Sequence, residues 1–203
     1  MRIHIKITLT GVENPIVWRT MVIPLESSFH QLHLYIQAAM GWKNAHLYSF
    51  QESPRSRFFT ITSPYFEEGS IDATEVNASS LLITYLNAGE FKFREDQPTE
   101  TIHYNYDFGD DWRHELEVLY LDRTDDLTPL VIDGAGACPP EDVGGVHGYA
   151  GFLDAISNPK MMDKDYKIWV KESGLKGFNK DAFDFQDANE RIRRVKKKDV
   201  SLN

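Results

Sequence analysis

The stretch that most constrains the fold of this chain is Tyr104–Glu117, which reads as a strand, a tight turn and a returning strand. Residues 101–108 are rich in aromatic and β-branched side chains, which favour strands. Gly109, Asp110 and Asp111 follow; glycine tolerates positive φ, and aspartate hydrogen-bonds to its own backbone in tight turns. Residues 114–121 alternate again between apolar and polar. The sequence therefore predicts a central β-hairpin.

The register of this hairpin decides which side chains meet. If the hairpin closes symmetrically on Asp110 and Asp111, Asp107 lies opposite His114 on one face of the sheet. Directly opposed side chains in an antiparallel pair are about 5 Å apart, close enough for a carboxylate to contact an imidazole. A slip of one residue would turn every side chain to the other face. The contact between Asp107 and His114 is therefore predicted on condition of this register.

A second polar cluster follows at residues 138–149, which read Cys-Pro-Pro-Glu-Asp-Val-Gly-Gly-Val-His-Gly-Tyr. It belongs to a loop predicted over residues 133–148, and loops of that length in compact domains are usually functional or disordered. The paired prolines and flanking aromatic residues argue against disorder. We therefore expect the hairpin and the loop to form two walls of one polar site. Its candidate residues are Asp107, Asp110, Asp111, Trp112, His114, Cys138, Glu141, Asp142, Gly144, Gly145 and Tyr149.

Periodicity predicts the elements before the hairpin. Residues 2–9 alternate as a half-buried strand, and residues 16–23 form a second strand that carries Trp18 into the core. Ser27 or Ser28 begins a helix that ends at Gly41. His33 lies beside the apolar stripe of this helix and is expected at the boundary of the core. Strands are expected at 46–51 and 57–62, and a helix from Asn77 or Ser79 to Asn87, although its apolar run equally suits a buried strand.

After the hairpin, the sequence predicts a short edge segment at 127–132 and helices at 149–157, 163–173 and 187–198. Strands grouped with helices in this way indicate an α+β fold, with a mixed or antiparallel β-sheet, helices packed on it, a central β-hairpin and C-terminal helices. The 203 residues suit a single domain over 1–203, with a basic C-terminal tail at 191–203.

The composition of the chain argues against a secreted protein, a membrane-spanning protein and a protein that coats DNA. The one cysteine cannot form an internal disulfide, and the N-terminus lacks the apolar block of a signal peptide, so a cytoplasmic location is expected. No apolar run approaches the roughly 20 residues of a membrane span, so no membrane partner is expected. The net charge of −9 argues against a protein that coats duplex DNA, because neutralising phosphates requires clustered Lys and Arg.

The chain resembles the plasmid pRiA4b ORF-three-like family, whose members are often described as passenger proteins of insertion elements. The most diagnostic blocks are Tyr-Asp-Phe-Gly-Asp-x-Trp-x-His at 106–114 and Cys-Pro-Pro-Glu-Asp-x-Gly-Gly at 138–145. Further matching stretches occur in the family's order at 15–19, 32–42, 46–47, 152–153 and 183–184. The resemblance implies an intracellular α+β domain and an association with mobile elements. It supplies no established activity, because the location of a gene is not a mechanism.

Two enzymatic hypotheses follow from the candidate residues. Asp107, His114, Glu141 and Asp142 are predicted ligands of a divalent metal, since carboxylate and imidazole ligands suit zinc, manganese or iron. Such an ion would activate water for hydrolysis, for example of a phosphodiester. Against this, their spacing matches no named metal motif, and acids near turns usually cap backbone amides. Alternatively, Cys138 would act as a nucleophile with His114 or His147 as its base.

Two binding hypotheses stand beside them. In the first, which we adopt as the expected role, the protein is an accessory module whose hairpin and loop form a rigid surface for a protein or peptide, with Trp112 and Tyr149 as anchors. In the second, nucleic acid binds the basic tail. Residues 191–203 carry six Lys or Arg and one Asp, a net +5, which leaves −14 for the rest of the chain. The six basic residues are Arg191, Arg193, Arg194, Lys196, Lys197 and Lys198. Alternatively, these basic residues only stabilise the last helix, because positive charges interact favourably with the negative end of a helix dipole at its C-terminus.

Overall fold

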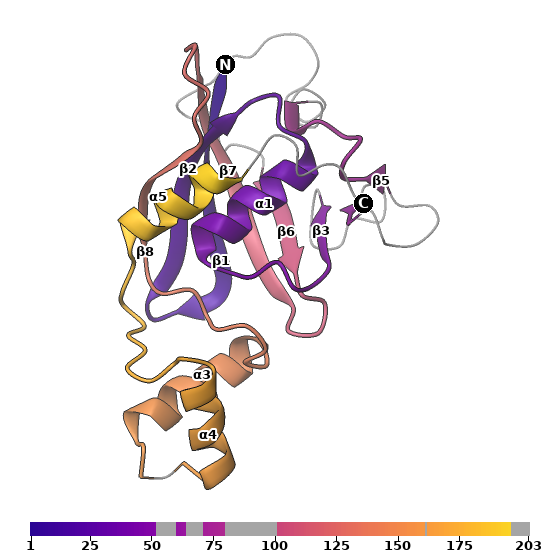
Figure 1. The fold of residues 1–203 in the computed structure, drawn as a ribbon. Coiled ribbons are helices and arrows are strands. Elements are labelled where there is room, and N and C mark those ends of the chain that lie inside the picture. The colour runs from indigo at the N-terminus through magenta and orange to yellow at the C-terminus, as the bar shows by residue number, and fades with distance from the viewer. Residues whose placement is uncertain (52–59, 64–70, 80–100, 161, 196–203) are drawn as a thin grey trace.

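A computed structural model of the protein describes residues 1–51, 60–63, 71–79, 101–160 and 162–195. Its strands and helices form an α+β fold, as predicted (Figure 1). The strands are β1 (Arg2–Glu13), β2 (Ile16–Pro24), β3 (Tyr48–Gln51), β4 (Thr60–Thr62), β5 (Ile71–Asp72), β6 (Thr101–Tyr106), β7 (Trp112–Asp122) and β8 (Leu130–Ala135). The helices are α1 (Phe29–Met40), α3 (Gly145–Ser157), α4 (Lys164–Glu172) and α5 (Phe185–Arg194).

The strands form one sheet in the order β5-β4-β3-β6-β7-β1-β2-β8. All described neighbours pair antiparallel except β4 and β5, which are parallel. The alternation predicted for the N-terminal strand is confirmed, because Ile3, Ile5, Ile7 and Leu9 are all buried. Strand β1 lies between β2 and β7, so the N-terminus of the chain is an inner strand of the sheet.

The predicted central hairpin is β6 and β7, but its predicted register is wrong. Tyr104, not Asp107, lies opposite His114. The cause is the turn, which has five residues, 107–111, and not two, because Asp107 and Asp111 both take left-handed backbone conformations with φ near 57° (58° and 56°). Aspartate tolerates this conformation better than most residues. The contact predicted between Asp107 and His114 is consequently absent.

Helix α1 crosses one face of the sheet (Figure 1). Its predicted ends are confirmed, since Ser28 and Gln31 form a reciprocal capping box and Gly41 ends the helix with φ 102°. His33 is not at the boundary of the core but fully buried. Its Nδ1 lies 2.8 Å from the Tyr104 hydroxyl and its Nε2 2.6 Å from Asn44 Oδ1, so both ring nitrogens have partners.

Helix α5 packs beside α1 and against β8. It begins at Phe185, two residues before the predicted start, because Asp184 caps it by accepting a hydrogen bond from the Asp187 amide. The Asn189 side chain donates to Val131 O (2.9 Å) and accepts from Val131 N (3.1 Å). This amide occupies backbone groups of β8 that would otherwise be open to pairing with another strand. The predicted extension of the helix to residue 198 lies outside the described residues.

Helices α3 and α4 lie beyond one end of the sheet, where with the following loop they form a helical arm, residues 145–184 (Figure 1). Phe152 holds the arm together through edge contacts with Trp169 and Phe178. The helix predicted at 163–173 is α4, and Asp163 caps it by accepting a hydrogen bond from the Tyr166 amide. Helix α3 begins at Gly145, four residues before the predicted start. The helix or strand predicted to run to Asn87 lies outside the described residues beyond Ser79.

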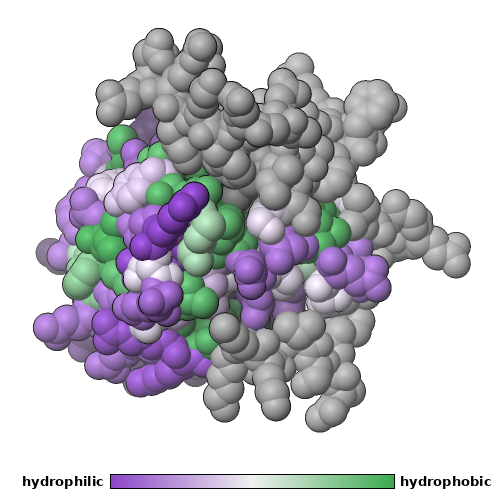
Figure 2. All heavy atoms as spheres, turned by 90° about the horizontal axis from the view of Figure 1, so that it is seen from above, coloured by the Kyte–Doolittle hydropathy of each residue, from purple (hydrophilic) through white to green (hydrophobic). Residues whose placement is uncertain are grey.

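Seen from above, the described surface is a mixture, with hydrophilic side chains along its margin and hydrophobic ones between them (Figure 2). None of the helices among the described residues has the length and apolar character that a membrane crossing requires.

Strand β2 places an arginine, not the predicted tryptophan, in the core. Trp18 is half-buried, with Lys6 Nζ 5.3 Å from its ring centroid, whereas Arg19 is only 2% exposed. The Arg19 guanidinium donates to four backbone carbonyls and stacks 3.8 Å from the ring centroid of Phe183. The acceptors are the carbonyls of Trp18, Ala39, Ala135 and Gly136. Burial lowers the pKa of Arg19 to about 10, so the group stays charged at neutral pH. Through its hydrogen bonds and its contact with Phe183, Arg19 links the sheet, α1 and the segment before α5.

We expect Arg19→Ala to lower the free energy of unfolding by at least about 3 kcal/mol, because it leaves buried carbonyls without donors. Arg19→Lys should recover little, since one ammonium cannot reproduce the planar fork of donors. Urea denaturation measures both. Arg113→Ala, which removes an exposed guanidinium, is the matched control and should cost under about 1 kcal/mol. Equal losses at the two positions would contradict this role for Arg19.

Candidate functional site

The hairpin turn and the loop 138–149 lie side by side, and the residue between them is His46. His46 Nε2 is 3.1 Å from Asp142 Oδ1, 3.5 Å from Asp107 Oδ2 and 3.8 Å from Glu141 Oε2. The atoms offered by His46, Asp107 and Asp142 all lie within 4.8 Å of one another. We call these three residues the His46 site.

The turn of the hairpin fixes Asp107. Its amide donates to Leu47 O (2.9 Å), which ties the turn to the segment that carries His46. Its Oδ1 accepts hydrogen bonds from the amides of Gly109 (2.9 Å) and Asp110 (3.3 Å). The second oxygen, Oδ2, is left to face His46. Asp107 is only 7% exposed, so this carboxylate is held in place largely away from water.

A hydrogen-bonded chain fixes Glu141. Its Oε1 accepts from the amide of Lys43 (2.7 Å) and from the hydroxyl of Tyr106 (3.1 Å). The Tyr106 oxygen in turn accepts from the amide of Ala45 (3.0 Å). Burial raises the pKa of Tyr106, so its hydroxyl keeps the proton that it donates. The Glu141 side chain is 9% exposed, and its other oxygen points toward His46.

Glycines allow the loop to approach the turn closely. The amide of Gly144 donates to Asp110 Oδ2 (3.0 Å). Gly145 has φ 67°, and a Cβ on this residue would lie 2.4 Å from Asp110 O, nearer than any side chain tolerates. Asp142 takes a left-handed conformation (φ 58°) that directs its largely exposed side chain to His46. Gly144 and Gly145 thus hold the two walls in contact, which is a packing role.

Carboxylate oxygens surround the Nε2 nitrogen of His46. Among the described residues this nitrogen is buried and has no hydrogen-bond partner, although Asp142 Oδ1 lies 3.1 Å away. A ring nitrogen with a free lone pair would be repelled by the carboxylates. A proton on Nε2, which the neutral Nε2–H tautomer already supplies, or a metal cation would remove that repulsion.

Several predicted site residues lie elsewhere. Trp112, His114 and Tyr149 are buried in the core. His114 Nδ1 lies 3.3 Å from Tyr104 O, its ring meets Trp42 edge-on, and burial lowers its pKa to about 3, so it is neutral. Of the four ligands predicted for a metal, the structure therefore places His114 apart from the three acids. Asp111 is engaged by Asn105 and Arg113.

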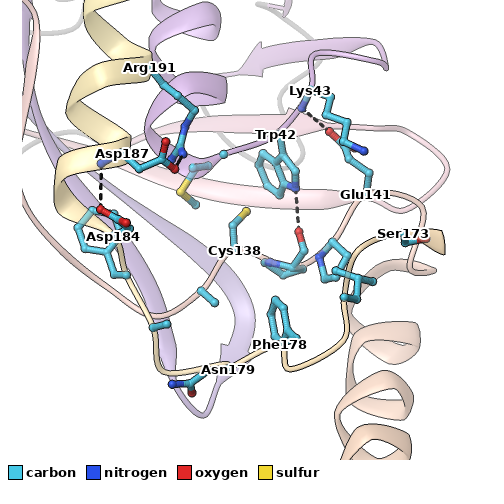
Figure 3. Close-up of a pocket in the computed structure, with 18 of the residues that line it drawn as sticks. Trp42, Lys43, Cys138, Glu141, Ser173, Phe178, Asn179, Asp184, Asp187 and Arg191 are labelled. Carbon is cyan, nitrogen blue, oxygen red and sulfur yellow. Dashed lines mark hydrogen bonds and ion pairs between the residues drawn. The ribbon is translucent and has the colours of Figure 1, made fainter. Parts of the chain in front are cut away.

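A cavity of about 520 Å³ lies between the helical arm, α5 and the loop, and we call it the arm cavity (Figure 3). Glu141 and Asp142 line it, so it shares a wall with the polar cluster around His46. The indole of Trp42 donates to Pro139 O (3.1 Å) and holds this wall. Cys138 also lines the cavity, and burial raises the pKa of its thiol, which disfavours the thiolate that a nucleophile needs. His147 is exposed on α3.

The basic tail is partly committed to packing. Arg191 donates to Ala38 O (2.7 Å) and pairs with Asp187, which docks α5 on the end of α1. Arg194 pairs with Glu190 (3.2 Å) and Arg193 is exposed. Lys196, Lys197 and Lys198 lie outside the described residues.

Sequence reasoning missed two residues of this site, His46 and Tyr106. His46 belongs to one of the stretches on which the family resemblance rests, but no local motif marks it as a ligand. Tyr106 lies in the diagnostic hairpin block and reads as a core aromatic residue. Its hydroxyl reaches Glu141 only because the five-residue turn sets the register of β6.

Two buried histidines predict a pH dependence of stability. Burial lowers the pKa of both His33 and His114 to about 3, whereas the unfolded chain protonates them near pH 6.5. The unfolded state therefore binds more protons below pH 6.5, and the free energy of unfolding should fall by up to about 1.4 kcal/mol per pH unit for each ring. Urea midpoints at pH 7.5, 6.5 and 5.5, with chelator present, measure this loss.

His147→Ala, which removes an exposed ring, should keep the full pH dependence, whereas His114→Phe should lose about half of it. A wild-type protein whose stability is flat over this range would contradict the neutral, buried state of the two rings.

Comparison with known proteins now identifies the family. The model of the family described as "Plasmid pRiA4b ORF-3-like protein" matches residues 2–187. The uncharacterized protein y4hQ of Sinorhizobium fredii is 38% identical over 161 residues, which are 77% of this chain and 74% of that protein. The crystal structure of MM3350, a protein of unknown function from Methanosarcina mazei Go1, has a TM-score of 0.70 and 27% identity, and the match covers 92% of this chain and 96% of that one. The family match and the curated relative confirm the resemblance seen in the sequence: the chain belongs to the plasmid pRiA4b ORF-3-like family.

Proposed function

We propose that the protein binds one divalent transition-metal ion at the His46 site and acts as a metal-dependent hydrolase. The observation that carries the proposal is the buried Nε2 of His46. In the part of the chain that the structure describes it has no hydrogen-bond partner, while carboxylate oxygens of Asp107 and Asp142 lie within 3.5 Å of it. A shared cation explains this arrangement, because each ligand then points its lone pair at the ion and not at another ligand.

The two separations from His46 Nε2 to the carboxylate oxygens suit such an ion. Bonds of about 2.0–2.1 Å in a tetrahedral zinc site place ligand atoms roughly 3.3 Å apart. The distances from His46 Nε2 to Asp142 and Asp107, 3.1 and 3.5 Å, bracket that value. One imidazole with two carboxylates is a ligand set suited to zinc, manganese or iron.

Three protein ligands leave coordination open, which is typical of catalytic and not structural sites. The Asp142 side chain is 72% exposed, so water reaches this side of the site. An ion bound there would supply a water molecule acidified toward neutral pH. Glu141 lies beside the site. The amide of Lys43 holds its Oε1, and its Oε2 lies 3.3 Å from the Tyr106 hydroxyl and 3.8 Å from His46 Nε2. A carboxylate in this place suits a group that accepts a proton.

The other roles expected from the sequence have less support from the geometry. Trp112 and Tyr149, the expected anchors for a protein partner, are buried in the core. Arg191, the first residue of the expected nucleic-acid surface, is engaged in helix packing. An association with mobile elements concerns the location of genes, and the shape of a site does not bear on it.

Metal binding can be tested directly. Apo protein should take up one zinc or manganese ion per chain by isothermal titration calorimetry and elemental analysis. His46→Ala and Asp142→Ala should each weaken binding on the order of 100-fold or more, because each removes a ligand. The matched controls His147→Ala and Glu115→Ala remove an exposed histidine and an exposed acid away from the His46 site and should bind as the wild type does.

Uptake of no ion, or equal uptake by the His46→Ala variant, would reject the proposal. In that case His46 only joins the turn to the loop by direct contacts, and added zinc should leave the stability of both wild type and His46→Ala unchanged.

A further inference from the structure

The arm cavity gives the metal site a means of choosing its substrate. We propose that it holds the aromatic or bulky aliphatic group of a neutral acyl compound, a carboxylic ester or amide, whose carbonyl lies at the His46 site. This inference rests on the proposed function, since it names the substrate class of the same site. The alternative that the sequence suggested, a phosphodiester, is disfavoured by the charges of the cavity.

The cavity and the metal site share a wall. Glu141 and Asp142 line the cavity and also lie 3.8 and 3.1 Å from His46 Nε2. Figure 3 shows Glu141 beside Trp42 and Lys43, with Cys138 and Phe178 across the hollow. His46 and Asp107 do not line the cavity, so the carbonyl of the proposed ligand would meet the metal site at the exposed side chain of Asp142.

Much of the cavity lining is apolar. Trp42 follows the end of α1, and Trp169, Phe178 and Phe183 belong to the helical arm. The volume, about 520 Å³, is within the range of roughly 300–1,000 Å³ typical of small-molecule sites. Aromatic walls drawn from two segments favour a ring or a branched chain over a solvated polar group.

The charged side chains of the cavity disfavour a phosphate-bearing ligand. Four carboxylates line the cavity, those of Glu141, Asp142, Asp184 and Asp187, against the cations of Arg19, Lys43 and Arg191. Arg19 is committed to four carbonyls, and Arg191 to Ala38 O and Asp187. A polyphosphate backbone needs uncommitted clustered cations, and the chain as a whole carries −9. A neutral apolar group meets no such penalty.

The reaction balances without a further reactant. The oxygen of water forms a bond to the acyl carbon, and the bond from that carbon to the leaving oxygen or nitrogen breaks. One proton of the water passes through Glu141 to the leaving group, which departs as an alcohol or amine, and the acid is the other product. No atom changes oxidation state in net terms, so neither oxidant nor reductant is required.

Hydroxamates test the inference, because they bind a metal ion with their oxygens in place of an acyl group. Full-length protein loaded with zinc is titrated by calorimetry with acetohydroxamate and with phenyl-bearing hydroxamates that have one to three methylenes between ring and chelating group. The best phenyl compound should bind at least about tenfold more tightly, since burying a ring removes apolar surface from water.

Two cavity variants separate this gain from chelation. Ala182→Trp fills the cavity from an exposed position, and Phe178→Ala removes one wall. In both variants the phenyl hydroxamate should bind no more tightly than acetohydroxamate, and the affinity for acetohydroxamate should equal that of the wild type. If Phe178→Ala folds poorly, Ala182→Trp alone still tests the inference. His46→Ala should lose binding of every hydroxamate.

The outcomes are distinct. If wild type takes up zinc and binds acetohydroxamate but gains nothing from the ring, the cavity inference is overturned and the metal site stands. A gain that survives in Ala182→Trp likewise overturns the cavity inference, because the ring then binds elsewhere. If the protein takes up no zinc at the His46 site, both proposals fail together.

Discussion

The five-residue turn at 107–111 is the constraint on which the rest of the site depends. Because Asp107 closes the turn through its own carboxylate and a left-handed backbone, β6 and β7 pair with Tyr104 opposite His114. That register sends the Tyr104 hydroxyl to His33 under α1 and the Tyr106 hydroxyl to Glu141. The same carboxylate has one oxygen left for His46. One turn thus sets the register of the sheet and the geometry of the polar site.

The histidines of the core and the histidine of the site have different surroundings. Among the described residues no carboxylate pairs with His33 or His114, and burial keeps both rings neutral. Around His46, carboxylates from the turn and the loop converge on a nitrogen that has no hydrogen-bond partner among the described residues. The metal ion that we propose would explain this convergence. The side chain of Asp142 is exposed, so water reaches this side of the site.

Local pattern predicted much of the fold and less of the site. The strand β1, the capped helix α1 and the hairpin follow from alternation, from Ser28 and Gly41, and from the glycine and aspartates of the turn. The register could not be predicted, because turn length depends on which aspartates adopt positive φ. Arg19 reads as a surface residue until its four carbonyl acceptors are seen. His46 lies about sixty residues before the hairpin in sequence, and only the pairing of β3 with β6 brings it to the turn.

The proposed function depends on a cation at the centre of the His46 site. Anomalous X-ray diffraction from crystals grown with zinc, recorded on either side of the zinc absorption edge, would show such an ion. We expect one strong peak about 2.0–2.2 Å from His46 Nε2, with carboxylate oxygens of Asp107 and Asp142 completing the protein ligands. A crystal with no peak at this position, and with the His46 ring hydrogen-bonded directly to Asp107 or Asp142, would contradict it.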